Sequence, residues 1–311
     1  MKRTLRASLA ALALAAPSAA SAQDAPPVPA STVKDEKATT GETNVASDKA
    51  AAMDAKGLRE GKDATELAVA AGTLVSTGNA RLWAVTSSGK FRLRRGEDQV
   101  SAAAAFNYAR AAAPPDGPMR TSVENVQGLA RYDRFLGDVA LFLQAQGRRN
   151  RFQGLDLRLN VDPGVGYYFV NQQDTLLWVE AGYDLLFDVR REEARVPLDA
   201  AGQPVPGAPL LDQTQTVHSA RLFAGYELAL DTGFKLSAGL EYLQGLAATG
   251  RQPGQSATEI YRLNGSIAAQ AKIQGNLSMS LAFTGRYDNG ALPGKEKLDT
   301  ITSANLVYTL L

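Results

Sequence analysis

The sequence predicts an all-β protein: a transmembrane, antiparallel, up-and-down β-barrel of about 12 strands, of the outer-membrane type. Three observations lead to this fold class. Apolar and polar residues alternate over long stretches, short turns alternate with mostly longer loops, and the chain begins with the features of an export signal.

The clearest alternation runs from Leu155 to Phe169, where apolar residues occupy every second position except that of Pro163. Because successive side chains of a strand point to opposite faces, one face of this segment is apolar and the other is polar or glycine. Strands of about ten residues or more with one apolar face are what a membrane-spanning barrel requires. Proline has no N–H for the strand ladder, so we expect a bulge or a local distortion at Pro163.

The start of the chain divides it into three parts. Residues 1–22 resemble a Sec-type signal peptide, with a basic start, a short Leu/Ala core and small residues up to Ala22. This core is shorter than the roughly 20 apolar residues that a membrane anchor needs. Residues 23–62 contain almost no large apolar side chain, so we expect a disordered periplasmic tail. Residues 63–311 then form the barrel.

Charge and composition limit the classes of function. Three of the 33 basic residues leave with the signal, so 30 remain against 32 acidic ones and the net charge is −2. This balance provides no electrostatic basis for binding nucleic acid. The chain has no cysteine, which excludes thiol chemistry, and no long apolar segment after the signal, which excludes helical membrane spans. We therefore expect export to the cell outer membrane of a diderm bacterium.

The connections between the predicted strands indicate how the barrel is oriented. Short turns alternate with mostly longer loops, the longest of which runs from Arg191 to about Gln215. In outer-membrane barrels the short turns face the periplasm, and an even number of strands places both chain ends there. The fifth strand is expected to give way to a polar segment at Gly147. The short turns are centred on Gly96, Gly137, Gln172, Thr232 and Gly275.

Charged residues on the polar face of successive strands are the candidate site. A soluble β-sandwich or lipocalin-like barrel would turn its apolar face inward, and it would not accommodate so many charges on strands of this length. In a membrane barrel these side chains line the lumen. They form either a polar conduit of mixed selectivity or a network of ion pairs that fills a barrel too narrow to conduct, and we favour the filled barrel. The predicted set comprises Arg158, Asp162, Glu180, Asp184, Arg221, Glu227, Glu241, Arg262 and Arg286.

The sequence gives little support for catalysis, and we predict that the protein is not an enzyme. The only histidine, His218, alternates with Ala220 and Leu222 and should face lipid, whereas Ser219 points the other way. A serine hydrolase needs a histidine within reach of its serine. We expect no catalytic residue, cofactor or metal site. Acidic residues such as Asp156 and Asp162 are spread apart along a strand, without a compact ligand loop.

Four segments carry a resemblance to a known family: GTLVSTGNA (72–80), RYDRFL (131–136), NRFQGLDLRLNVDPGVGYYF (150–169) and RYDNGALPGKEKLDTITSANLVYTL (286–310). Together they resemble the family of salt-induced outer-membrane proteins, the domain of unknown function 481. The resemblance implies an outer-membrane barrel and supplies no mechanism.

These observations leave three classes of function open. The first is a non-enzymatic role in envelope integrity or in osmotic or salt stress. The alternative is a narrow porin-like channel for ions or small solutes, and the third is a barrel lipid hydrolase. The expected partners are outer-membrane lipid, lipopolysaccharide and the barrel-assembly machinery, and we expect a monomer.

Overall fold

The computed structural model describes residues 63–76, 81–112, 118–150, 153–172, 174–198, 203–230 and 233–309. The predicted signal peptide and the predicted tail lie outside these residues. Within them the chain forms twelve strands and two short 3-10 helices. In chain order they are β1 (Ala64–Ser76), β2 (Arg81–Arg95), β3 (Asp98–Ala112), β4 (Arg120–Leu136), β5 (Val139–Asn150), β6 (Leu155–Asn171), β7 (Thr175–Arg190), η3 (Glu192–Ala194), β8 (Thr214–Ala229), β9 (Phe234–Thr249), η4 (Ala257–Glu259), β10 (Tyr261–Gln274), β11 (Leu277–Asp288) and β12 (Leu298–Thr309).

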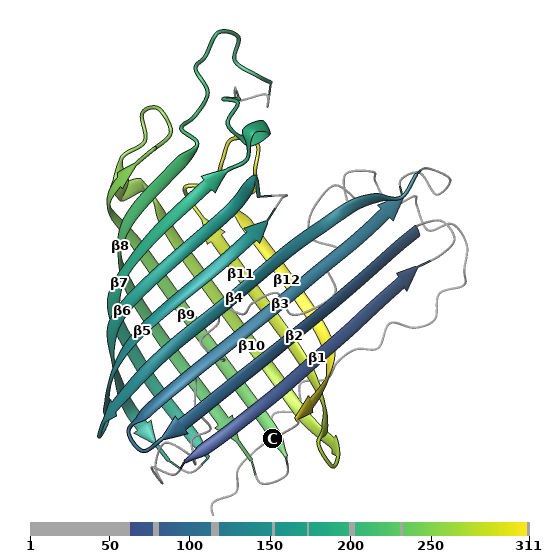
Figure 1. The fold of residues 1–311 in the computed structure, drawn as a ribbon, viewed down its shortest axis with the longest axis vertical. Helices are drawn as coiled ribbons and strands as arrows, with labels where there is room; N and C mark the ends of the chain where they lie inside the picture. The colour runs from purple at the N-terminus through teal and green to yellow at the C-terminus, as the bar shows by residue number, and fades with distance from the viewer. Residues whose placement is uncertain are drawn as a thin grey trace, which may run out of the picture.

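Every strand pairs in antiparallel fashion with the next one in the chain, and β12 pairs with β1 (Figure 1). This is the up-and-down order that the sequence predicts, and the antiparallel strand architecture is confirmed. The strands are 12–17 residues long in the described part of the chain. Their length follows from the long alternation of apolar and polar residues, which no turn sequence breaks within a strand.

The surface polarity of the barrel is the reverse of that of a water-soluble protein. Large apolar side chains such as Phe169, Leu222 and Met279 are more than half exposed on the outside. Charged and amide side chains are buried inside, among them Gln99, Arg131 and Glu180. A continuous apolar exterior is stable only in hydrocarbon, and a closed strand ladder satisfies the backbone groups that lipid cannot. The fold is therefore that of an outer-membrane-type barrel.

The two ends of the barrel differ in their connections. At one end, short turns join β2 to β3, β4 to β5 and β10 to β11, and each of these turns has a glycine with positive φ: Gly96, Gly137 and Gly275. Long loops cover the other end, and β1 begins and β12 ends on the side of the short turns (Figure 1). We call these the turn end and the loop end. No helix among the described residues is long and apolar enough to cross a membrane.

One expectation about local structure is confirmed in part and one is wrong. Pro163 causes no bulge, because β6 keeps one register with β7 from Val161 to Gly164. The pairing with β7 is nevertheless interrupted at Asp162 and Pro163, which is a local distortion of the ladder. The side chain of Pro163 is exposed. The fifth strand does not stop at Gly147 but continues to Asn150, because Gly147 and Arg148 pair with β6. Backbone pairing with a long neighbour outweighs the local polar composition.

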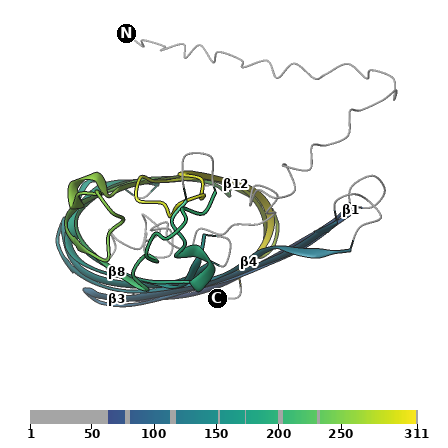
Figure 2. The same cartoon turned by 90° about the horizontal axis from the view of Figure 1, so that it is seen from above.

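Among the described residues, the pairing of β1 with β12 is much shorter than any other. It comprises four residue pairs there, from Ala68 with Thr309 to Ala71 with Leu306. The other neighbouring strands have 11–15 pairs each among the described residues. Toward the loop end, β1 diverges from β12 in both views (Figures 1 and 2). The ring is thus joined only near the turn end, and we call this pairing the seam.

Candidate functional site

The lumen contains a chain of buried ion pairs that links strands far apart in the ring. Arg131 on β4 binds Glu180 on β7 with Nη2–Oε1 and Nη1–Oε2 distances of 2.8 and 3.2 Å. Arg221 on β8 binds the same carboxylate at 2.8 Å and Glu241 on β9 at 2.7 Å. The side chains of Arg131, Glu180 and Arg221 are 0–2% exposed. We call Arg131, Glu180, Arg221 and Glu241 the central network.

Glycines on the inner face make room for these contacts. Gly166 lies opposite Glu180 in the register of β6 and β7, so the carboxylate reaches over β6 toward β4. A Cβ on Gly164 would lie 2.4 Å from the ring of Phe142, and one on Gly182 would lie 2.6 Å from a backbone oxygen of β6. Because these positions carry no side chain, Arg131 can span two intervening strands.

Aromatic rings surround the central network on the side of the turn end. Trp178 donates a hydrogen bond to Glu180 at 3.2 Å, and its ring lies against Gly225 on β8. The guanidinium of Arg131 lies 4.1 Å from the centre of the Phe142 ring, at which cation–π attraction is effective. A cluster of buried hydrophobic side chains lies at this level, made up of Phe135, Ala140, Tyr168, Leu176, Trp178 and Phe223.

Further pairs continue the polar interior toward the loop end. Asp184 accepts hydrogen bonds from Arg262 at 2.7 Å and from Asn160 at 2.5 Å. Arg158 binds Asp188 through two nitrogens, at 2.6 and 2.7 Å, and Asp288 through a third at 3.3 Å. These contacts join β6, β7, β10 and β11 across the lumen.

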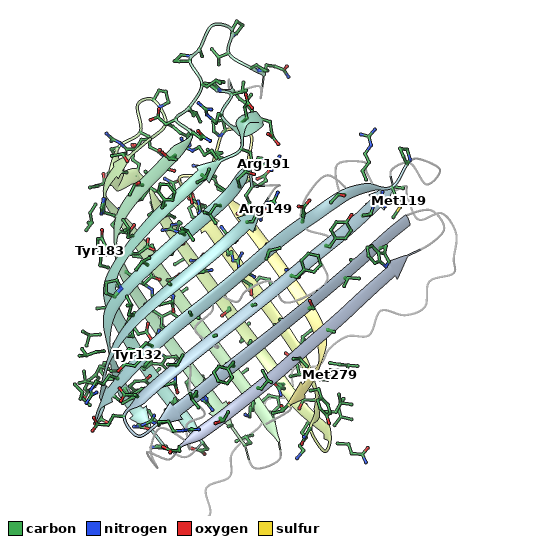
Figure 3. The ribbon with its side chains drawn as sticks, viewed as in Figure 1. Met119, Tyr132, Arg149, Tyr183, Arg191 and Met279 are labelled. Atoms are coloured by element: carbon green, nitrogen blue, oxygen red, sulfur yellow. The ribbon has the colours of Figure 1, made fainter. Side chains whose placement is uncertain are left out.

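Between these pairs and the long loops lies a polar space of about 90 Å³, which we call the upper cavity. Its floor includes Asp162, Asp184 and Glu241, and residues 290–297 of the loop between β11 and β12 cover it. Near the cavity mouth Arg191 binds Asp156 and Glu193, and the hydrogen bond to Glu193 raises the pKa of Arg191. Figure 3 shows Arg149 and Arg191 at this end of the barrel and Tyr132 and Met279 near the other.

The structure places the predicted lumen residues in three groups. Glu180, Arg221 and Glu241 belong to the central network. Glu227 lies apart, near Tyr168 toward the turn end. The third group lines the upper cavity and comprises Arg158, Asp162, Asp184, Glu241, Arg262 and Arg286. Glu241 thus belongs both to this group and to the central network.

Sequence reasoning missed three important charged residues. Arg131 and Asp133 face inward and bind each other at 2.7 Å, and the alternation in RYDRFL could have revealed them. Arg148 lies in the polar segment where the fifth strand was expected to end, whereas it belongs to β5 and lines the upper cavity.

His218 has no catalytic neighbour among the described residues. Its ring forms a hydrogen bond with the hydroxyl of Tyr183 on β7, while Ser219 is buried on the opposite face of β8. No group of three or more histidine, aspartate or glutamate side chains in the described ranges could hold a metal ion.

An apolar exterior, twelve antiparallel strands and a charged, buried lumen together define the class of outer-membrane β-barrel proteins. Within this class, residues 69–310 match the family model described as "Protein of unknown function, DUF481", and the chain belongs to this family. No curated protein matches the sequence.

Several solved barrels are similar at low identity. The NanC porin shares 11% identity over 79% of this chain and all of its own, with a TM-score of 0.42. The translocator domain of the autotransporter NalP from Neisseria meningitidis shares 14% over 79% and 87%, with a TM-score of 0.39. The outer membrane channel DcaP of Acinetobacter baumannii shares 8% over 80% and 96%, with a TM-score of 0.34. None of the three scores reaches 0.5, so the family assignment rests on the family model alone.

Proposed function

We propose that this protein is a non-enzymatic barrel of the cell outer membrane whose lumen is closed by its own side chains, and that it supports envelope integrity under osmotic or salt stress. The burial of the central network carries the proposal. Charged side chains that line a water-filled conduit are solvated, whereas those of Arg131, Glu180 and Arg221 are almost inaccessible to water.

The stress role is consistent with this arrangement. Salt screens exposed ion pairs strongly and buried pairs much less. A barrel held together by buried pairs therefore keeps its lumen contacts when the external salt concentration rises. The resemblance to salt-induced outer-membrane proteins points to the same role. We further propose that the mature chain reaches the membrane through its Sec-type signal and the barrel-assembly machinery, and that it is a monomer surrounded by lipid and lipopolysaccharide.

A narrow channel for ions or small solutes is the second candidate. The upper cavity favours it, because a polar space beneath the long loops is a natural entrance. In that case the central network is a gate rather than a permanent closure. Hydrolysis of lipid has no comparable support, since His218 contacts a tyrosine on the outer face.

Conductance measurements distinguish the two candidates. We expect the purified protein in planar bilayers to show no steady current at physiological salt. Arg131→Ala should introduce openings, because it removes the side chain that connects β4 with Glu180 in the central network. A steady ion-selective current through the unmodified protein would contradict a closed lumen and establish the channel.

A further inference from the structure

Among the described residues, Arg148 of the upper cavity has no ion-pair partner. Arg148 lies on the inner face of β5, directly opposite Arg158 of β6. Its Nε is buried and has no hydrogen-bond acceptor. Two like charges in opposite positions of a strand pair destabilise each other. Arg158 is neutralised by Asp188 and Asp288, and Arg148 has no such pair among the described residues.

The carboxylates around Arg148 are engaged by other groups. The charged residues beside Arg148 include Arg158, Arg286, Asp188 and Asp288, and Asp299 lies opposite Arg286 in the register of β11 and β12. Asp188 accepts two hydrogen bonds from Arg158, and Asp299 accepts one from Gln153 at 2.5 Å. Asp288 accepts one from Arg158 and one from the N–H of Gly290 at 2.9 Å.

The acids on the cavity floor also have other partners. Asp184 is bound by Arg262 and Glu241 by Arg221. Asp162 accepts a hydrogen bond from Gln144 at 3.0 Å. The lining as a whole is balanced, with seven basic and seven acidic side chains. Among the described residues, however, none of these carboxylates forms an ion pair with Arg148.

We propose that the upper cavity binds a small oxyanion, a carboxylate or phosphate group, through Arg148, with Arg158 and Arg286 beside it. The forked N–H donors of a guanidinium match the oxygens of either group. A space of about 90 Å³ accommodates a group of this size. Arg148 is two residues from the end of β5, so the ligand enters from the loop end. This site goes beyond the proposed function, because binding requires no passage through the lumen.

Calorimetry with the purified full-length protein in detergent tests the site. Inorganic phosphate and acetate are titrated separately at constant ionic strength, with chloride as the reference anion. We expect saturable binding of at least one of the two, and Arg148→Gln should weaken it at least tenfold. The matched control is Arg149→Gln: this neighbour points outward, toward Glu124 at 3.9 Å, and the change should leave binding unaltered.

Unfolding provides a second measurement that does not depend on heats of binding. Without the anion, Arg148→Gln should raise the urea midpoint, because the repulsion between Arg148 and its cationic neighbours is removed. Adding the anion should raise the midpoint of the unmodified protein and leave that of the variant unchanged. The proposal is overturned if neither phosphate nor acetate binds the unmodified protein, or if Arg148→Gln binds as tightly as the unmodified protein does. Neither result depends on whether the lumen conducts, so the proposed function is tested separately.

Discussion

Replacing Arg221 by alanine tests whether the lumen is dry. Arg221 is fully buried and connects Glu180 with Glu241. Breaking a buried pair by removing one partner costs about 3–5 kcal/mol, because a charge is left without compensation. In a water-filled conduit the same pair would contribute only about 0–1 kcal/mol.

The contacts that remain place the expected cost near the lower end of that range. Glu180 keeps both hydrogen bonds from Arg131 and the one from Trp178. Glu241 keeps a hydrogen bond from Asn264 at 2.8 Å, and its side chain is 13% exposed, so water can reach it. We therefore expect a loss of about 3 kcal/mol. With a urea dependence of about 2–3 kcal/mol per M, the unfolding midpoint falls by roughly 1–1.5 M.

Tryptophan fluorescence during urea unfolding in lipid vesicles measures this shift. The chain has two tryptophans. Trp178 donates to Glu180, and Trp83 lies on the outside, so a Trp83→Phe background isolates the reporter in the lumen. Arg191→Ala, which removes a more exposed pair in the loop region, is the control and should not shift the midpoint. An unchanged midpoint for Arg221→Ala, with ion selectivity moved toward cations, would refute the reasoning and indicate a hydrated conduit.

Three further predictions concern the outer face, the glycines and the orientation. His218→Ala should leave any lipid-hydrolysing activity of the purified protein unchanged, and a complete loss of a reproducible activity would show that the protein is an enzyme. Gly225→Ala should cost about 1–3 kcal/mol in urea unfolding, because its Cβ would lie 2.2 Å from a buried indole ring. Gly89→Ala should not lower the stability, because a Cβ at that position would have nothing within 4 Å. Equal effects of the two substitutions would argue against close packing of the indole ring on Gly225. On intact cells a membrane-impermeant maleimide should label Val205→Cys in a long loop but not Asp174→Cys in a short turn. The opposite labelling pattern would show that the barrel has the reverse orientation in the membrane.

The fold could be predicted because each barrel strand can be recognised from its own sequence. Alternation with a period of two depends only on local sequence, and it assigns Glu180, Asp184 and Arg221 to one face wherever the strand is placed. The turn glycines Gly96 and Gly137 are likewise local, since positive φ favours glycine.

The partners within the lumen could not be predicted in the same way. Arg131 and Glu180 are 49 residues apart and meet only because β5 and β6 present a phenylalanine and glycines at that level. Such contacts depend on the stagger of the whole ring, which no single strand encodes. The place of Arg148 could not be predicted for a different reason: the segment from Gly147 is polar and does not alternate, and pairing with β6 keeps it in a strand.

The seam has a consequence for how the surrounding medium affects the barrel. In the part of the chain that the structure describes, four residue pairs hold β1 to β12, so these two strands are the edges at which the ring is weakest. In hydrocarbon, each backbone group freed by separation would cost several kcal/mol, because lipid offers no hydrogen bond. In a micelle, water reaches such an edge and the penalty falls. The bilayer thus opposes separation of β1 from β12 at the seam. Part of the stability of this barrel is therefore supplied by the membrane rather than by the polypeptide.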